Sequence, residues 1–200
     1  MPNIREPKNA RSIEKKNKII KAGLEIFGTN GYYNTTTVDI AKKAGVSTGI
    51  VYNYFLDKKD IFLQSLKLYF DNIYNPIVDK LNNIKNVNLE DTIDDIINFA
   101  IESHKEDLLA HEEMIAMSHL DEDVHKVFIY AENKMTEQIV LCLQRNNINI
   151  ENIKEKVHIL YNLVENLCHE YFYHRHDYIN YSVMINETKK LILALLKTWQ

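Results

Sequence analysis

Polar side chains able to hydrogen-bond with nucleic acid are concentrated between residues 35 and 58 of this 200-residue chain. Thr35 and Thr36 stand where a helix is expected to begin, so their hydroxyls and the helix N-terminus could bind a phosphate. Asn53 carries the amide that pairs with adenine in the major groove, although a surface Asn that contacts only phosphate or water is an equal alternative. The candidate set for DNA contacts is Thr35, Thr36, Ser47, Thr48, Gly49, Tyr52, Asn53, Tyr54 and Lys58.

Two short helices joined by a sharp turn would have to position this set. Gly45 comes where the first helix must end on a residue that tolerates a positive φ, and Ser47 follows as an N-cap for the second. The apolar residues that would pack the two helices together are Ile40, Ala41, Ala44, Val46, Val51 and Phe55. This layout over residues 37–56 predicts a helix-turn-helix, whose second helix enters the major groove. An ordinary αα-hairpin is the alternative.

The segments around the motif resemble the N-terminal domain of the TetR family of transcriptional regulators over about residues 14–66. The matching signals are Phe-Gly-x-x-Gly-Tyr at the end of a first amphipathic helix, Thr-Thr at the start of the next, Ile-Ala-x-x-Ala-Gly-Val-Ser-x-Gly-x-Val-Tyr-x-Tyr-Phe, and x-x-Lys-x-x-Ile-Phe. Asn53 and Tyr54 depart from the Tyr and His common in the family, and Thr37 from an aliphatic residue. The first two departures lie at the DNA face, so they put the operator sequence in doubt and not the DNA-binding role.

The resemblance implies an all-α fold of about nine helices. An N-terminal three-helix helix-turn-helix DNA-binding domain, residues 1–60 with the motif at about 35–56, would precede a larger ligand-binding and dimerisation domain, residues 61–200. Lys58 matches the family's phosphate-contacting lysine. The implied function is a repressor that a small molecule releases from a palindromic operator. A metal-responsive regulator using histidines of the C-terminal domain and, distantly, a helical enzyme are the alternatives.

The charge of the chain is divided unevenly. Residues 1–60 carry 11 Lys and Arg against 6 Asp and Glu, a net of +5, whereas the other 140 residues carry 13 against 22, a net of −9. A basic N-terminal segment followed by an acidic remainder is the charge distribution typical of a DNA-binding domain joined to a domain of another kind. A chance difference between the two parts is the alternative.

The remaining chain predicts helix after helix, because all five glycines precede residue 50 and apolar residues recur at helical spacing. The expected helices run from Lys58 to about Leu81, Leu89 to about His104, a short piece to His119, Asp121 to Gln144, about Glu151 to His174 and Tyr181 to Thr198. Pro76 should bend or break the first of these. For Arg5, Lys8 and Arg11, a solvated disordered tail is favoured over a DNA-binding arm.

The last two helices are the predicted partner surface. Their apolar stripes are Ile153, Val157, Leu160, Val164, Leu167 and Tyr171, and Met184, Thr188, Leu191, Leu195 and Trp199, the second broadened by Ile192 and Leu196. The resemblance implies that two helices, about residues 151–174 and 181–198, pair with the same helices of a second copy in a four-helix homodimer bundle. A monomer with a buried C-terminal hairpin is the alternative.

The resemblance also implies a small-molecule pocket between residues 60 and 175, whose effector the sequence does not identify. Candidate lining residues are Tyr69, Tyr74, Phe99, His104, Met114, Met117, Tyr130 and Tyr161. At helical spacing most of these are expected to be ordinary core. An aromatic cationic ligand would suit the acidic surroundings through cation–π contact, unless the acids all face water.

No cofactor, metal site or catalytic residue is predicted. The histidines form two loose groups, His169, His174 and His176 near Glu170 and Asp177, and His104 and His111 near Glu112, but neither has a recognised ligand spacing. The Gly-rich loops of nucleotide-binding enzymes and hydrolases need glycines that are missing after Gly49. Two cysteines, no run of about 20 apolar residues and a start without a signal-peptide core predict a cytoplasmic protein without contact to a membrane.

Overall fold

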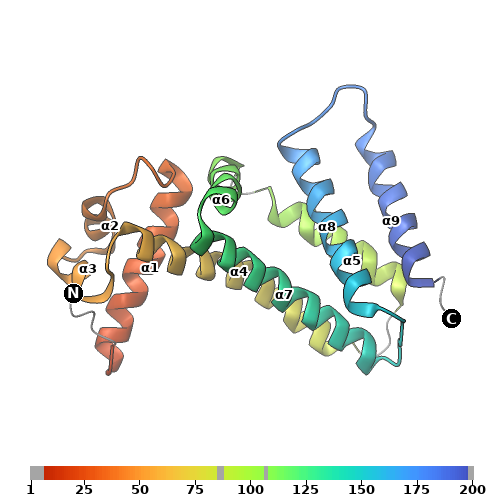
Figure 1. The fold of residues 1–200 in the computed structure, drawn as a ribbon, viewed down its shortest axis with the longest axis horizontal. Coiled ribbons are helices and arrows are strands. Elements are labelled where there is room, and N and C mark those ends of the chain that lie inside the picture. The colour runs from red at the N-terminus through yellow and green to blue at the C-terminus, as the bar shows by residue number, and fades with distance from the viewer. Residues whose placement is uncertain (1–6, 85–87, 106–107, 198–200) are drawn as a thin grey trace. The chain divides into compact units, whose positions relative to one another are not determined.

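The computed structural model describes residues 7–84, 88–105 and 108–197, and in these ranges all regular structure is helical. The nine helices found there are α1 (Ala10–Asn30), α2 (Thr37–Ala44), α3 (Thr48–Tyr54), α4 (Lys58–Asn83), α5 (Leu89–Ser103), α6 (Leu108–Leu120), α7 (Glu122–Arg145), α8 (Ile153–Phe172) and α9 (Tyr181–Lys197) (Figure 1). The all-α prediction is confirmed, and the predicted helix limits after residue 58 differ from these by only a few residues. None of these helices combines the length and the apolar character that crossing a bilayer requires.

Helix α1 begins at Ala10, before Arg11, for which a disordered tail was expected. Asn9 is its N-cap, with the Asn9 side chain accepting the Ser12 N–H and the Ser12 hydroxyl accepting the Asn9 N–H. This reciprocal pair satisfies two backbone donors that would otherwise lack partners. Arg11 therefore lies in the helix, and its assignment to a disordered tail was wrong. Arg5 lies outside the described residues.

Helix α4 runs without interruption through Pro76, so of the two effects expected there, a bend or a break, the break does not occur. The proline removes one backbone N–H and therefore one bond of the helical ladder. At the other end of the helix, the Asp57 carboxylate accepts the Asp60 N–H at 2.9 Å, as an N-cap side chain does.

The chain divides into two compact units, each with its own core. Unit 1 comprises Met1–Asn72 and Leu109–Ala131, and unit 2 comprises Ile73–Leu108 and Glu132–Gln200. Helices α4 and α7 each contribute residues to both units. A functional division at residue 60 remains a prediction, because compactness does not by itself assign function.

The core of unit 1 joins the first three helices to α4, α6 and the start of α7. Its largest fully buried side chains include Ile19, Ile40, Val51, Phe55, Ile61, Leu66 and Val124. A second connection is polar, since Lys59 Nζ on α4 lies 2.8 Å from carboxylate oxygens of both Asp121 and Asp123 at the start of α7. The helix-turn-helix is thus packed onto segments that lie far along the chain.

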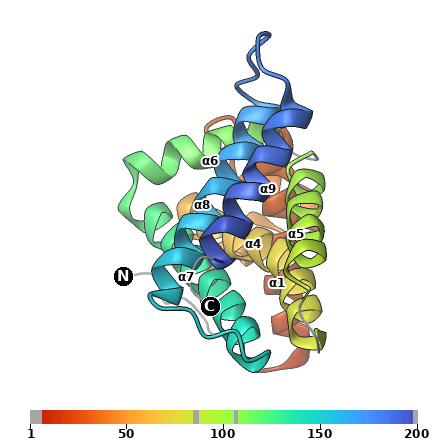
Figure 2. The ribbon, with the colours of Figure 1, turned by 90° about the vertical axis from the view of Figure 1, so that its right-hand side faces the viewer.

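Unit 2 is built on α5, α8 and α9, which lie side by side (Figure 2). Their shared core contains Ile93, Ile97, Val164, Leu167, Cys168, Ile192 and Leu196. An ion pair of 2.8 Å between Lys189 Nζ and Asp94 Oδ1 links α9 to α5. The stripe predicted on α8 and α9 is therefore partly internal, while Trp199 lies outside the described residues.

Candidate nucleic-acid interface

Helices α2 and α3 form the predicted helix-turn-helix, and local hydrogen bonds fix both ends of α2. Thr36 is the N-cap, in a reciprocal capping box with Asp39. Gly45 ends the helix at φ 68°, in the left-handed region that favours glycine. Hydrogen bonds from Thr36 lower the pKa of the Asp39 carboxyl and so keep it ionised at the positive end of α2.

Helix α3 buries one side and exposes the other. Val51 and the C-cap residue Phe55 are at most 1 % exposed in the core of unit 1. On the exposed side lie Gly49, Asn53 and Tyr52, the last with 48 % of its surface accessible. The Tyr52 hydroxyl is 3.1 Å from the Thr37 hydroxyl on α2, which orients the ring outside the core. The outward side chains therefore alternate with buried anchors, as a helix that enters a groove requires.

The other DNA candidates differ in how far they are exposed. Thr48 and Tyr54 are half-buried, and Ser47 stands at the N-cap of α3 without a side-chain capping bond. Thr35 is buried, and its hydroxyl donates to the Gly31 carbonyl at 2.7 Å. In this arrangement Thr36, which is exposed, offers the more accessible hydroxyl of the threonine pair.

Lys58 is held beside the turn between α1 and α2. Its Nζ donates to the Tyr32 carbonyl at 2.8 Å and lies 4.2 Å from the centre of the Tyr32 ring. Burial and the nearby Asp57 carboxylate raise the pKa of the Tyr32 phenol, which stays neutral at physiological pH. The ammonium is thus positioned at the N-terminus of α4, at the edge of the helix-turn-helix.

Glu113, which the sequence did not single out, hydrogen-bonds to the same turn between α1 and α2. The Glu113 carboxylate on α6 accepts the Tyr32 N–H at 2.8 Å and the Tyr33 N–H at 3.5 Å. Gly31 has φ 78°, and a Cβ there would collide with the Glu113 carboxylate. No local sequence signal pairs residues 81 positions apart, so spacing along the chain could not have revealed this contact.

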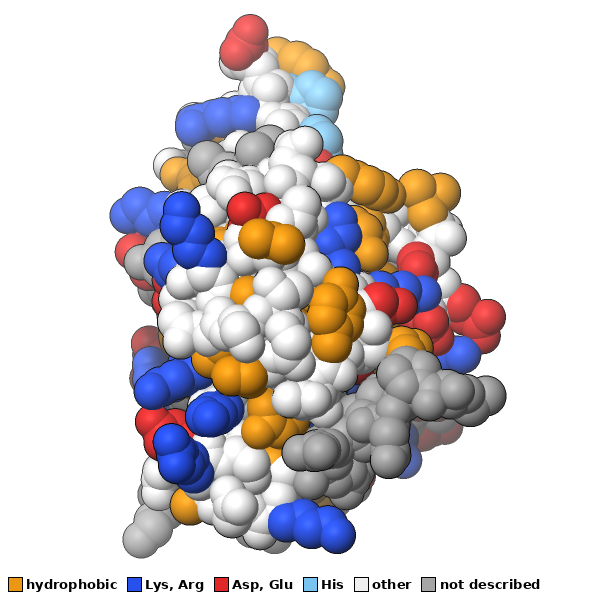
Figure 3. All heavy atoms as spheres, turned by 90° about the vertical axis from the view of Figure 1, so that its left-hand side faces the viewer, with side chains coloured by type: hydrophobic (Ala, Val, Ile, Leu, Met, Phe, Trp, Pro, Cys, Tyr) orange, Lys and Arg blue, Asp and Glu red, His pale blue; other side chains and the backbone are white. Residues whose placement is uncertain are grey.

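Exposed lysines accompany the motif. Lys42 and Lys43 lie on the surface of α2, and Lys43 Nζ pairs with Glu25 Oε2 of α1 at 2.6 Å. Figure 3, which views the side of α1, α2 and α3, shows lysine and arginine side chains gathered along one edge of this face. The excess of positive charge expected from the sequence is therefore displayed on the surface that carries α3.

The predicted effector residues are divided between the two units. Met114 and Met117 are buried in the core of unit 1, Tyr69 packs against that core, and Tyr130 is 64 % exposed. In unit 2, the hydroxyls of Tyr74 and Tyr161 are 2.7 Å apart, and burial, followed by the charge of Glu165, raises the pKa of the Tyr161 phenol. Sequence spacing could not separate core residues from these hydrogen-bonded ones, because both kinds recur on buried helix faces.

Phe99 lines a groove of about 240 Å³ between the C-terminal part of α4 and α5. Ile77, Leu81 and Ile96 supply apolar walls, and Lys80 Nζ lies 5.8 Å from the centre of the Phe99 ring. The groove also contains the carboxylates of Asp91 and Asp95.

The histidines are grouped differently from the sequence-based expectation. His104, at the C-cap of α5, lies with Glu165 and His169 of α8, and neither of the two loose groups predicted these three together. Burial opposes the protonation of His104, but contacts with Cys168 and Glu165 raise its pKa to about 10. Glu165 and His169 share a helix face at i, i+4 spacing, a signal visible in the sequence, whereas their meeting with α5 is a product of packing.

Comparisons with known proteins agree with this geometry. Residues 19–64 match the model of bacterial regulatory proteins of the tetR family. The HTH-type transcriptional regulator HbdR of Aromatoleum sp. (strain CIB) is 47 % identical over 58 residues, 29 % of this chain and 25 % of that protein. IcaR of Staphylococcus aureus (strain Newman), a negative transcriptional regulator of the biofilm operon icaADBC, is 40 % identical over 63 residues, 32 % of this chain and 34 % of that protein. These matches thus span only a quarter to a third of the relatives' lengths.

The likeness of fold extends over nearly the whole chain. A crystal structure from Mesorhizobium loti MAFF303099, described as a putative TetR-family transcriptional regulator, superposes with a TM-score of 0.74. It is 19 % identical to this protein, and the superposition covers 96 % of this chain and 99 % of that one. The match over residues 19–64 therefore shows that the N-terminal segment is similar to bacterial regulatory proteins of the tetR family, and the superposition shows that the likeness of fold extends beyond this segment.

Proposed function

We propose that this protein is a ligand-responsive, DNA-binding transcriptional regulator. It acts as a repressor that binds a palindromic operator in the cytoplasm and catalyses no reaction. The observation that carries the proposal is the exposed side of α3, where Gly49, Tyr52 and Asn53 face outward from a helix anchored by Val51 and Phe55. Thr36 and Lys58, at the start of α2 and α4, are the proposed phosphate contacts beside it.

The proposed regulator is a homodimer that pairs through α8 and α9. Although both helices contribute to the core of unit 2, they also expose large apolar side chains. Ile159 is 55 % exposed, Val183 52 % and Leu191 59 %. A second copy would cover such side chains and would present two recognition helices to successive major grooves, about 34 Å apart. One small head contacts too few base pairs for useful specificity, so DNA binding itself favours a dimer.

The effector is proposed to act through α4, which carries Lys58 at its start and contributes Tyr74 to unit 2. A small molecule that competes for the hydrogen bond between Tyr74 and Tyr161 would shift α4, and with it the helix-turn-helix. A preference of about 1–3 kcal/mol for the released state is enough for typical allosteric coupling. By linkage, operator DNA must weaken effector binding by the same factor by which the effector weakens operator binding.

Lysine replacements provide the direct test of the DNA contact. Duplexes selected from a random library by the purified wild-type protein serve as probes in a fluorescence anisotropy titration over a range of salt concentrations. Lys58→Ala should weaken binding to every sequence. It should also lower the slope of the logarithm of affinity against the logarithm of salt concentration by about one per DNA-binding domain. Lys67→Ala is the matched control, because this exposed lysine also lies on α4 but several turns away from the motif.

Asn53→Ala tests base recognition separately from phosphate binding. Loss of a base contact should change which selected duplexes are preferred, at a cost of about 1–3 kcal/mol for the best site. Two results together would show that α3 is not the DNA-reading element. In the first, Lys58→Ala and Lys67→Ala both retain the DNA affinity and the salt slope of the wild type. In the second, Asn53→Ala retains the wild-type preference among the selected duplexes.

A further inference from the structure

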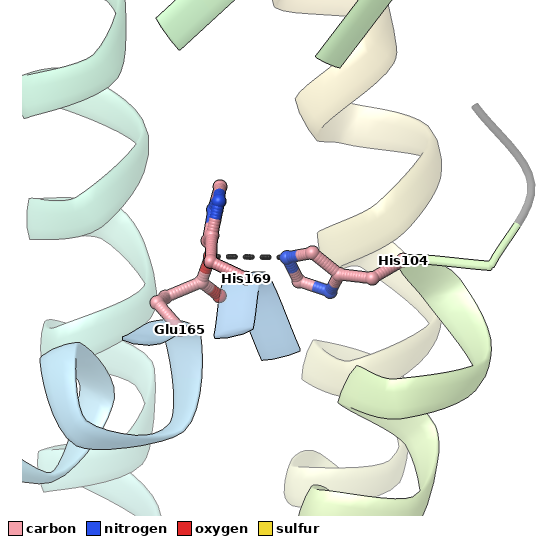
Figure 4. A group of neighbouring side chains, drawn as sticks. All are labelled: His104, Glu165 and His169. Atoms are coloured by element: carbon pink, nitrogen blue, oxygen red, sulfur yellow. Dashed lines mark ion pairs between the residues drawn. The ribbon is translucent and has the colours of Figure 1, made fainter. Parts of the chain in front are cut away.

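Three side chains that can ligate a metal meet inside unit 2. His104 projects from the end of α5, and Glu165 and His169 project toward it from consecutive turns of α8 (Figure 4). One donor atom from each residue lies within 4.8 Å of the other two. His104 Nε2 and Glu165 Oε2 lie 3.3 Å apart.

The orientation of His104 is fixed by the backbone of its own helix. Its Nδ1 lies 2.8 Å from the Ala100 carbonyl oxygen, and since a carbonyl can only accept, Nδ1 carries a proton and donates it. The other ring nitrogen, Nε2, therefore points toward Glu165. Histidines that ligate metals in proteins commonly donate their second ring N–H to a backbone carbonyl in this way.

The distances suit a tetrahedral ion. Zinc binds imidazole nitrogen and carboxylate oxygen at about 2.0–2.2 Å, so two of its ligand atoms lie about 3.3 Å apart. The His104–Glu165 pair already has this separation. Rotation of the half-buried His169 side chain, one turn beyond Glu165 on the same helix face, would bring the third donor to the ion.

Two imidazoles and one carboxylate select the class of ion. Imidazole suits Zn²⁺, Co²⁺, Ni²⁺ and Cu²⁺, whereas Mg²⁺ and Ca²⁺ prefer shells of oxygen atoms. With 9 % of the His104 side chain and 28 % of the Glu165 side chain exposed, the cluster is largely shielded from water but still reachable from it. A metal ion would replace the proton on Nε2 that otherwise pairs with Glu165.

We propose that His104, Glu165 and His169 bind one divalent transition-metal ion of the zinc class, which joins α5 to α8. Three protein ligands leave the fourth position of a tetrahedral ion to water or to a small ligand. The inference does not depend on DNA binding, because the ion would bind the protein alone. The competing interpretation is an internal ion pair between His104 and Glu165, which predicts no affinity for the metal.

The test is a competition titration of Zn²⁺ between a chromophoric chelator and the full-length, tag-free protein stripped with EDTA. The wild type should take up one ion per chain, and His104→Gln, Glu165→Gln and His169→Gln should each weaken binding by at least about tenfold. His158→Gln is the matched control, because this histidine is exposed on the same helix and lies outside the cluster. Its zinc affinity should equal that of the wild type.

Cobalt provides a measurement that needs no variant and so cannot be confused with misfolding. Wild-type protein with one equivalent of Co²⁺ should develop visible d–d absorption without the near-ultraviolet charge-transfer band of a thiolate ligand. A wild type that takes up neither ion overturns the proposal. So does zinc binding that survives in all three ligand variants, or a thiolate band, which would assign the site to Cys168 instead.

Discussion

Gly23→Ala and Gly49→Ala form a matched pair of substitutions for which the structure predicts opposite changes in stability. Gly23 lies at the contact of α1 with α4, where an added Cβ would be 2.7 Å from Ser65 Oγ and 2.9 Å from Ile61 Cγ2. At Gly49, on the exposed side of α3, the nearest such atom would be Ser47 Oγ at 4.0 Å. Ala therefore has room at one position and none at the other.

The size of the stability loss expected for Gly23→Ala depends on the side chains that an added Cβ would displace. Ile61 is fully buried, and Ser65 is 1 % exposed with its hydroxyl donating to the Ile20 carbonyl at 3.0 Å. Overpacking costs about 1–3 kcal/mol, and a displaced Ser65 loses a hydrogen bond of about 1 kcal/mol. The higher helix propensity of Ala offsets about 1 kcal/mol. The expected net loss of unfolding free energy is therefore about 1–3 kcal/mol.

At Gly49 only the propensity gain remains, so the unfolding free energy should rise by up to about 1 kcal/mol. DNA affinity should nevertheless fall, because the methyl group would stand on the proposed groove-facing side. The same residue change thus separates a glycine needed for packing from one needed for DNA contact.

The assay is urea unfolding monitored by circular dichroism at one protein concentration, since the proposed dimerisation would make apparent stability depend on concentration. The double variant Gly23→Ala with Ser65→Ala should lose less than the sum of the single losses, because removing the hydroxyl relieves one of the two close contacts. A Gly23→Ala protein as stable as the wild type would refute the close approach of α1 to α4. A Gly49→Ala protein with unchanged DNA affinity would refute the proposed role of Gly49.

Three further outcomes are expected. Thr36→Ala removes the capping box of α2 and should lower the unfolding free energy by about 1 kcal/mol in the same urea assay, with no loss if the cap is unimportant. The hydrogen bond from Lys59 lowers the pKa of Asp121 below its ordinary 3.8, so its contribution to stability is present above that pH and is lost as pH falls through the folded-state pKa. The thermal midpoint of Asp121→Asn should therefore lie below that of the wild type at pH 7 and converge with it in acid, and parallel pH profiles would contradict the pairing. Burial raises the pKa of the Cys142 and Cys168 thiols, so a chromogenic disulfide reagent should react with them rapidly only after denaturation, and rapid labelling of the native protein would show that at least one of them is accessible.

Local signals in the sequence determined the helices and most of their ends. Thr36 starts and Gly45 ends a helix where the pattern predicted, through capping bonds and a left-handed backbone that involve only residues close by in the chain. Asp57 and Asn88 make capping bonds of the same local kind. The helix-turn-helix and the basic character of the first 60 residues were visible for the same reason. The start of α1 was not predicted, because the capping residues Asn9 and Ser12 are polar and do not belong to the apolar pattern from which helices are recognised in a sequence.

Tertiary structure alone decided which helix faces meet. Helical spacing marks Met114, Met117, Tyr74 and Tyr161 equally as inward-facing, but only packing sends the methionines to the core of unit 1 and joins the two tyrosines in unit 2.

The contacts of Glu113 with the α1–α2 turn, and of His104 with Glu165 and His169, likewise join residues separated by about 60 to 80 positions. A helix repeats every 3.6 residues and so specifies which of its side chains are buried. It does not specify the partner they are buried against, because burial of apolar surface is non-directional. Helix α3 could therefore be located from the sequence, whereas the contact of Glu113 with the α1–α2 turn and the candidate metal site required the folded chain.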